Sequence, residues 1–468
     1  MPNRVKRKSL SPALSELLLF LLCPLPWRGW NRKIEHVNDE LGSLLRRLGV
    51  SKGARHLRPA IPIKGDDRPS RYEDATPPSL EVLLPGGRLL ESADGACFVV
   101  DRVFPLHYRH GADTLADLLA VQPAAGAPYI SDDRLNGHGF GDFLFLDTET
   151  TGLAGAGALA FMVGVAFFES RTVQADDAQV ERQVLVVRQY FLRDHGDKPA
   201  MLRQLDELLA GKAGLITFNG RSFDVPLLDN RYLMNRLRGR LPEMPHIDLL
   251  LPARRLFRAR LGSCALGALE QNLLGLQRTH DDVPGWLIPS LYHNFLRTGD
   301  ARELTRVFYN NEMDMLSMVT LAARMFRHMT TCACDDALDQ VSLGRWQIDL
   351  GLFDEAERAL RAALEDDATS LDAYQQALSH LGALYKRTER RPQAVLAWQQ
   401  LAVVSTGDVS AHVELAKHYE WHAADTPAAM EWTRRALALV DRLPLTPNTR
   451  LTRAELTHRL LRLEKKAR

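Results

Sequence analysis

The sequence contains little cysteine, and its cysteines are scattered. Five occur in 468 residues without regular spacing, at Cys23, Cys97, Cys264, Cys332 and Cys334. An odd, dispersed set argues against the disulfide framework of a small secreted domain and is typical of a reducing compartment. We therefore expect a cytoplasmic protein. The close pair at 332 and 334 has no second ligand pair in the sequence, so it does not indicate a zinc site.

Long apolar runs and an excess of charge are also missing. No stretch approaches the 18 or more apolar residues of a membrane span, so we expect no membrane partner. Basic residues before the apolar stretch 17–25 imitate a signal peptide, but Glu16 and Pro24 interrupt the pattern and no small-residue cleavage site follows. The formal net charge is +1, so any binding of nucleic acid must come from a local basic surface.

The length is enough for two or three domains. We expect residues 1–79 to be weakly ordered, because their second half is a linker rich in Pro, Arg, Lys and Asp. Short apolar pieces predict a lead-in segment over residues 80–135. Residues 136–330 then predict an α/β domain, a mixed sheet flanked by helices, because several strands come first and a strand then alternates with helices. Residues 336–468 predict an all-α domain.

A predicted buried strand ends in two acidic residues. Four apolar residues at 143–146 are followed by Asp147 and, two residues later, by Glu149. Side chains at i and i+2 of a strand point to the same face, so the two carboxylates lie side by side. Taken alone, the pair could lie in a surface turn. After a buried strand, mutual repulsion and lost hydration require that one carboxyl is protonated or that a cation lies between them, and hard divalent ions such as Mg²⁺ and Mn²⁺ prefer carboxylate oxygen.

Further strands and two further acidic positions follow. Strands are predicted over 158–168, 183–192 and 215–218, and the last one leads through Asn219-Gly220 to Asp224 at the start of a helix. An acid there could instead only stabilise the helix through its dipole, an interaction worth about 0.5 kcal/mol. Asp314 lies on the buried side of a long helix predicted over 301–328 and needs a partner there.

Two other patterns lie close to these positions. The loop at 155–160 matches a dinucleotide-binding pattern by letter, but a strand follows it instead of a helix, so we interpret it as a glycine-rich hairpin loop near the carboxylates. The predicted helix at 254–260 carries four arginines. Arginines at this density can bind phosphates. They are explained equally well as the solvent-exposed face of a helix.

These acidic positions resemble the three motifs of DEDD-type 3′→5′ exonucleases of the ribonuclease H-like superfamily. The resemblance covers roughly residues 140–330 and rests on Asp147-Thr148-Glu149, on Asn219 with Phe223-Asp224, and on Asp314. Longer stretches are similar to the YprB-type subgroup, namely 150–155, 219–228, 246–250 and 281–285.

The resemblance implies hydrolysis of phosphodiester bonds with two divalent ions, Mg²⁺ or Mn²⁺, about 4 Å apart. It implies that Asp147 bridges both ions, that Glu149 and Asp314 hold the ion that activates water, and that Asp224 supports the other. We also predict that residues in and around these motifs contact the substrate: Thr150, Gly152, Leu153, Asn219, Phe223, Asp248 and Arg255.

The general base departs from the family pattern, which has a His five residues before the last Asp or a Tyr four before it. Here the two catalytic candidates are Tyr309 at five and Asn310 at four. A five-residue offset rotates a side chain about 140° on a helix and a four-residue offset about 40°, so Tyr309 misses the cleft unless the helix starts or bulges there. Asn310 faces the cleft but cannot take a proton. His280 or His246 could substitute, or the metal could act alone.

The C-terminal third carries a loose repeat. The segments 354–356, 392–394 and 427–429 are offset by 38 and 35 residues, close to the 34-residue tetratricopeptide repeat. We expect a helix-turn-helix unit repeated about three times, with a plain helical bundle as the alternative. Such repeats usually bind a protein partner, and their basic residues could instead extend a nucleic-acid track. Three tryptophans are interpreted as core residues: Trp398, Trp421 and Trp432.

The sequence therefore favours a metal-dependent nuclease, a 3′→5′ exonuclease on single-stranded DNA or RNA with a helical tail for a partner. Two alternatives stay open, namely a nucleic-acid-binding or scaffold protein whose nuclease fold has lost turnover, and a structure-specific endonuclease. The four acids favour catalysis, because a binding module gains nothing from clustered buried carboxylates.

Overall fold

The structure is a computed structural model that describes residues 78–152, 158–175, 178–278, 282–405, 407–444 and 446–468. Nearly all of the predicted N-terminal region 1–79 lies outside these ranges, as do Leu153, the first half of the loop at 155–160, and His280. None of the helices in the described part combines the length and apolar character needed to cross a bilayer.

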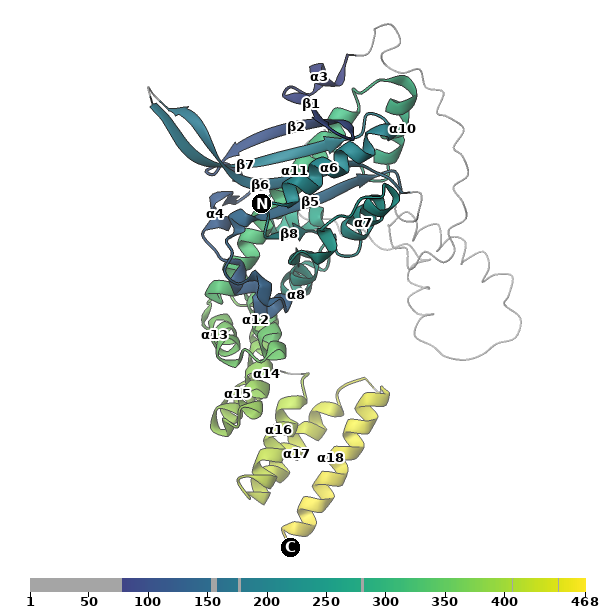
Figure 1. The fold of residues 1–468 in the computed structure, drawn as a ribbon. Coiled ribbons are helices and arrows are strands. Elements are labelled where there is room, and N and C mark those ends of the chain that lie inside the picture. The colour runs from purple at the N-terminus through teal and green to yellow at the C-terminus, as the bar shows by residue number, and fades with distance from the viewer. Residues whose placement is uncertain (1–77, 153–157, 176–177, 279–281, 406, 445) are drawn as a thin grey trace, which may run out of the picture. The chain divides into compact units, whose positions relative to one another are not determined.

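A seven-stranded mixed sheet forms the centre of the α/β part, as predicted (Figure 1). The strand order is β1-β2-β7-β6-β5-β8-β9, in which β5, β8 and β9 run parallel and the other neighbours pair antiparallel. The strands are β1 (Gly87–Ser92), β2 (Gly95–Pro105), β5 (Phe143–Thr150), β6 (Ala160–Ala175), β7 (Ala178–Phe191), β8 (Gly214–Thr217) and β9 (His246–Asp248); a separate pair joins β3 (Arg109–His110) to β4 (Asp113–Thr114).

The predicted lead-in segment contributes two strands to this sheet. β2 pairs along β7 from Phe98 opposite Phe191 to Pro105 opposite Val184, and β1 continues the sheet beyond β2. This pairing was not predictable from the sequence, because β5 and β6 lie between β2 and β7 along the chain. Cys97 to Val100 are fully buried as a result, which explains their apolar character.

Helices cover both faces of the sheet because β5 is apolar on both. Leu144 and Leu146 lie in one core with α6, α7 and α10, and Phe143 and Phe145 lie in a second core with α8 and the C-terminal part of α11. The odd-numbered positions of β5, which include Asp147 and Glu149, therefore belong to the α11 face. The helices of this part are α3 (Leu80–Leu83), α4 (Ala116–Leu119), α5 (Ala127–Ile130), α6 (Lys198–Leu209), α7 (Asp224–Met234), α8 (Leu250–Leu261), α9 (Leu266–Leu269), α10 (Ile288–Thr298) and α11 (Leu304–Thr331).

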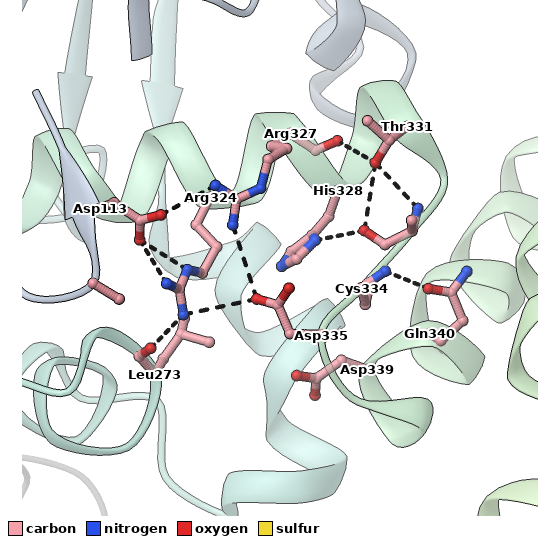
Figure 2. Close-up of polar contacts among 12 residues, drawn as sticks. Asp113, Leu273, Arg324, Arg327, His328, Thr331, Cys334, Asp335, Asp339 and Gln340 are labelled. Atoms are coloured by element: carbon pink, nitrogen blue, oxygen red, sulfur yellow. Dashed lines mark hydrogen bonds and ion pairs between the residues drawn. The ribbon is translucent and has the colours of Figure 1, made fainter. Parts of the chain in front are cut away.

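A polar network anchors the C-terminal end of α11 (Figure 2). Arg324 donates from Nε to Oδ2 of buried Asp113 at 2.9 Å and also donates to the Leu273 carbonyl, while Arg327 donates to Oδ1 of Asp113 at 3.1 Å. Both guanidinium groups also lie 3.8 Å from Oδ2 of Asp335. Since a buried carboxylate needs a paired cation, the two arginines tie α11 to β4 and to the segment before the next helix.

The segment around Cys332 and Cys334 is held by hydrogen bonds. The ring Nδ1 of His328 lies 2.7 Å from the Ala333 carbonyl, and the backbone N–H of Cys334 donates to the side chain of Gln340 (Figure 2). Within the described residues, the side chains that could together hold a metal lie elsewhere.

Paired helices follow in the C-terminal part: α12 (Ala337–Leu350) with α13 (Phe353–Glu365), α14 (Leu371–Arg387) with α15 (Arg391–Val404), α16 (Ser410–Trp421) with α17 (Thr426–Val440), and then α18 (Pro447–Lys466). A Cβ on Gly382 would lie 2.3 Å from the indole Nε1 of Trp398, so glycine permits the close approach of α14 and α15. Trp398 is buried and Trp432 half-buried, but Trp421 is 56% exposed beneath Arg459, so its assignment to the core was wrong.

Candidate functional site

Three carboxylates converge where β5 meets α11. One ligand atom from each of Asp147, Glu149 and Asp314 lies within 4.8 Å of the other two. The first two side chains leave the same face of β5, and α11 crosses that face with Asp314. Oxygen ligands about 2.1 Å from one Mg²⁺ ion lie up to about 4 Å apart, so small rotations of these carboxylates suffice to hold such an ion.

Asp224 lies on the other side of Asp147. It begins α7, and its Oδ1 accepts a hydrogen bond from the Thr148 hydroxyl. Glu149 and Asp314 line a cavity of about 880 Å³, Asp224 lines a neighbouring cavity of about 670 Å³, and Asp147 and Thr148 line both. Asp147 thus lies between Glu149 and Asp314 in one cavity and Asp224 in the other. Asp224 is not part of the cluster of three.

Burial and repulsion by neighbouring carboxylates raise the pKa of all four carboxyl groups. Burial is the largest cause in each case. The pKa of Glu149 rises to about 8, with contributions from Asp314 and Asp224, and the pKa of Asp147 rises well above its usual range. The pKa values of Asp224 and Asp314 rise to about 6, opposed by the Thr148 hydrogen bond and the Arg278 guanidinium respectively. The donors are all hard oxygens in a site short of positive charge, which fits Mg²⁺ or Mn²⁺.

Arg278 places a positive charge beside Asp314. Its NH2 donates to Oδ1 of Asp314 and, at 2.6 Å, to Oε1 of Glu270, while its Nε donates to Oε2 of Glu270 at 2.7 Å. Glu270 is 2% exposed in a π-helix, Glu270–Leu274, and also accepts from the Ser317 hydroxyl at 2.6 Å. The buried glutamate fixes the guanidinium by a bidentate pair, which is geometrically specific.

Asn311 connects Asp147 to the neighbouring strands. Its Nδ2 donates to Oδ2 of Asp147 at 3.2 Å, and its Oδ1 accepts from Nε2 of Gln189 at 3.0 Å. The amide lies directly on Gly164 of β6, which pairs with Asp147 across the sheet. A Cβ at Gly164 would stand 2.0 Å from Oδ1 of Asn311, so this position requires glycine.

Replacing Gly164 with alanine should therefore destabilise the domain by about 1–3 kcal/mol, because the added methyl group overpacks a filled site. It should also weaken metal binding, since Asn311 must leave Asp147. Urea denaturation and a Mn²⁺ titration measure the two effects. Gly407→Ala is the control, because a Cβ there meets nothing within 4 Å. Equal stability of the two variants would contradict the close approach.

Two predicted catalytic residues have other surroundings. Tyr309 lines a separate cavity with Arg102 and Glu312, because α11 is already helical there and the five-residue offset turns it away. Asn310 does line the carboxylate cavity, but its amide pairs with the backbone of Val283, accepting from its N–H at 3.2 Å and donating to its carbonyl at 2.8 Å. The side chain serves to hold that loop.

His246, considered as a substitute base, is buried in β9 with Nε2 2.8 Å from the Thr217 hydroxyl. Burial and the nearby Arg221 lower its pKa to about 4. His280 lies outside the described residues.

The predicted substrate residues fall into two groups. Thr150, Gly152, Asn219 and Phe223 line the cavity that contains Asp224, and Phe223 is 51% exposed there. The second group, Asp248 and Arg255, does not line this cavity. The carboxylate of Asp248 accepts from the backbone N–H groups of Asn219, Arg221 and Leu250, at 2.8, 3.1 and 3.1 Å, and so fixes the turn after β8. Arg255 pairs with Asp349 of α12 at 3.1 Å, and Leu153 is outside the described residues.

The sequence did not identify Arg278, Glu270, Gln189 or Gly164 as parts of the site. Asn311 could have been found, because it precedes Asp314 by three residues and therefore shares its helix face. The other four act through contacts between distant segments, for which the local sequence carries no signal.

The raised pKa values predict a pH-dependent stability of the metal-free protein. A group whose pKa is higher in the folded state stabilises the fold below its unfolded pKa, and that contribution is lost as the pH rises through its folded pKa. Here the losses fall near pH 6 for Asp224 and Asp314 and near pH 8 for Glu149. The melting temperature in EDTA should fall between pH 5 and pH 9. A Glu149→Gln variant should show a smaller fall above pH 7, and identical profiles for the two proteins would contradict the prediction.

Comparisons with known proteins agree with this geometry. Residues 144–326 match the model of the RNase_H superfamily, a range that contains all four carboxylates. The chain is also 29% identical over 360 residues to the uncharacterized protein YprB of Bacillus subtilis (strain 168), an alignment that covers 74% of this chain and 81% of that protein. Residues 144–326 thus match an RNase H superfamily domain, and YprB is a distant relative of this chain.

Proposed function

We propose that this protein is a divalent-metal-dependent nuclease that hydrolyses the phosphodiester bonds of single-stranded DNA or RNA from the 3′ end. The observation that carries the proposal is the convergence of Asp147, Glu149 and Asp314 within 4.8 Å in an RNase H superfamily domain. The exonuclease direction rests on the resemblance of the acidic motifs to those of DEDD-type enzymes. Two bound ions, Mg²⁺ or Mn²⁺, would supply an activated water and charge stabilisation at the leaving oxygen.

Two ions would be held by different residues, Glu149 and Asp314 for one and Asp224 for the other. Asp147 could contribute to both, because it lines both cavities. Thr148 orients Asp224, and Asn311 orients Asp147, through their hydrogen bonds. Such partners of metal ligands tune affinity by about 10–100-fold. For the paired C-terminal helices we propose binding of a protein partner, as in helical repeats generally.

One observation favours a second candidate, a nucleic-acid-binding protein without turnover. In the described part of the carboxylate cavity, Asn310 occupies the position of the family's base, and its amide is held by Val283. Tyr309 lies in another cavity. If the ions alone activate water, turnover persists without a side-chain base.

The deciding experiment incubates the purified full chain with single- and double-stranded DNA and RNA, labelled at either the 5′ or the 3′ end, in Mg²⁺, Mn²⁺ or EDTA. A 3′→5′ exonuclease gives a descending ladder from the 5′ label and immediate release of a mononucleotide from the 3′ label. Cleavage of a circular single strand would identify an endonuclease instead. Intact but retarded substrate in every metal would overturn the nuclease proposal in favour of binding alone.

A further inference from the structure

Helix α8 presents an exposed basic face. Leu251, Arg254, Arg255 and Arg258 are exposed at spacings of three and four residues, which place them on one side of the helix. The opposite side is buried through Pro252, Ala253, Leu256 and Phe257. We call Arg254, Arg255 and Arg258 the arginine ridge. The amphipathic pattern leaves this side of α8 open to a ligand, although Arg255 also pairs with Asp349 of α12.

The arginine ridge separates two cavities. Arg254 and Arg258 line the cavity of about 880 Å³ that contains Asp147, Glu149 and Asp314. The same two arginines line a second cavity of about 430 Å³, which continues to α5 and α12 and includes Arg255. Ligand sites commonly measure about 300–1,000 Å³, so both cavities can hold parts of a ligand. A strand that occupies the acidic cavity therefore has a continuous basic wall to follow.

The second cavity is both basic and apolar. Four arginines line it: Arg221, Arg254, Arg255 and Arg258. Its acidic lining residue, Asp248, is engaged by three backbone N–H groups. Arg254 and Arg258 form no ion pair with any residue in the described ranges, so their charge is available. Leu251, which is 59% exposed, and half-buried Tyr129 add an apolar surface beside these charges.

We propose that the arginine ridge and the second cavity bind the part of a single-stranded polynucleotide that lies outside the catalytic cavity. The proposal rests on the nuclease function proposed above and adds the path of the strand: from the carboxylates, across α8, to the junction with α12. The arginines contact successive phosphates, and Tyr129 and Leu251 contact a base. Combined basic and aromatic or apolar surfaces of this kind bind single strands without sequence preference.

The size of the ridge sets a length requirement. Leu251 and Arg258 are seven residues apart, so the face spans roughly 10 Å along the helix axis. That length corresponds to about three stacked nucleotides at about 3.4 Å each. A dinucleotide in the acidic cavity does not extend across the ridge into the second cavity, whereas a strand of twelve nucleotides does. Affinity should therefore rise with length, and the rise should depend on the arginines.

Fluorescence anisotropy with fluorescein-labelled oligodeoxynucleotides in Ca²⁺ or EDTA tests the proposal with the full chain. The variant Arg254→Glu/Arg258→Glu should bind a twelve-nucleotide strand at least about tenfold more weakly than the wild type. The slope of log K against log salt should fall by about 1.4 for two lost contacts to a single strand. The matched control, Arg238→Glu/Arg358→Glu, makes the same charge change at positions whose side chains are 88% and 67% exposed, and should bind as the wild type does.

A milder variant, Arg254→Ala/Arg258→Ala, keeps the test valid if the charge reversal disturbs folding. Thermal melting curves show whether each of the two ridge variants is folded. Equal loss in the control variant, or unchanged affinity and salt slope in the ridge variants, would overturn the proposal. Displacement of the oligonucleotide by polyglutamate of equal charge would also overturn it, because the ridge would then recognise an acidic peptide.

Cleavage gives an independent readout. If the nuclease is active, the ridge variants should raise the KM for the twelve-mer more than the KM for a dinucleotide, with little change in kcat. If no cleavage occurs in any metal, the nuclease proposal fails while the binding assay still decides the role of the ridge.

Discussion

Replacing Asp147 with asparagine is expected to abolish metal-dependent hydrolysis while preserving the fold. Asp147 lines both cavities of the site, so its loss removes a ligand from each proposed ion. Loss of a group that merely supports a metal ligand costs about 10–100-fold, and loss of a shared ligand should exceed about 100-fold. The asparagine side chain keeps a carbonyl oxygen that can accept from Asn311. Initial rates on a 5′-labelled strand in Mn²⁺ measure the effect.

The stability of this variant should change in the opposite direction. In EDTA at pH 8 the Asp147→Asn protein should melt at a higher temperature than the wild type, because one buried carboxylate no longer repels its neighbours. Divalent metal should raise the melting temperature of the wild type and have little effect on the variant. Asp142→Asn, at an exposed position just before β5, is the control for charge and should retain activity. Retained activity in Asp147→Asn would exclude the proposed ligand set.

Replacing Arg278 with alanine is expected to produce the largest loss of stability. The guanidinium is the partner of Glu270, whose side chain is 3% exposed, and removing one member of a buried ion pair costs about 3–5 kcal/mol. Asp314 loses a neighbouring cation at the same time. The free energy of unfolding, measured by urea denaturation at pH 7 in EDTA, should fall accordingly. Mn²⁺ should restore part of it, since a bound ion would neutralise Asp314.

A second substitution separates this electrostatic loss from lost packing. Adding Glu270→Gln to Arg278→Ala removes the uncompensated buried charge, so the double variant should be more stable than Arg278→Ala alone. Arg238→Ala is the control, because its pair with Glu243 is exposed and such pairs contribute about 0–1 kcal/mol. If Arg278→Ala unfolds at the urea concentration of the wild type, the pair has no structural role.

The sequence predicted those parts of the fold that have a local pattern. The apolar run 143–146 fills both cores as β5, and the period of α11 brings Asp314 to the face of Asp147. Pairing between distant strands was not predictable in the same way. β2 pairs with β7 although β5 and β6 lie between them in sequence. The residues of neither strand indicate which strand it pairs with.

The site follows the same division. Residue types and spacing pointed to Asp147 and Glu149, because two acids after a buried strand are costly unless one is protonated or a cation joins them. Asp224 and Asp314 were linked to this pair by the resemblance to the DEDD-type motifs. The helical offset also predicted that Tyr309 turns away. The roles of Arg278 and Gly164 could not be predicted, since the first depends on a π-helix that presents Glu270 and the second on an amide from α11. Asp248 was expected to contact the substrate, and its three backbone partners give it a structural role.

The spread of the carboxylates along the chain has a consequence during synthesis. Asp147 and Glu149 leave the ribosome early, and the β6–β7 hairpin can pair as soon as it emerges, because its strands are adjacent in sequence. Asp314 is made 167 residues after Asp147, a delay of roughly 10–30 s at about 5–20 residues per second. Until α11 has emerged, the nascent chain cannot assemble the full set of carboxylates. The proposed nuclease activity is therefore delayed until α11, which is followed by 137 further residues, has left the ribosome.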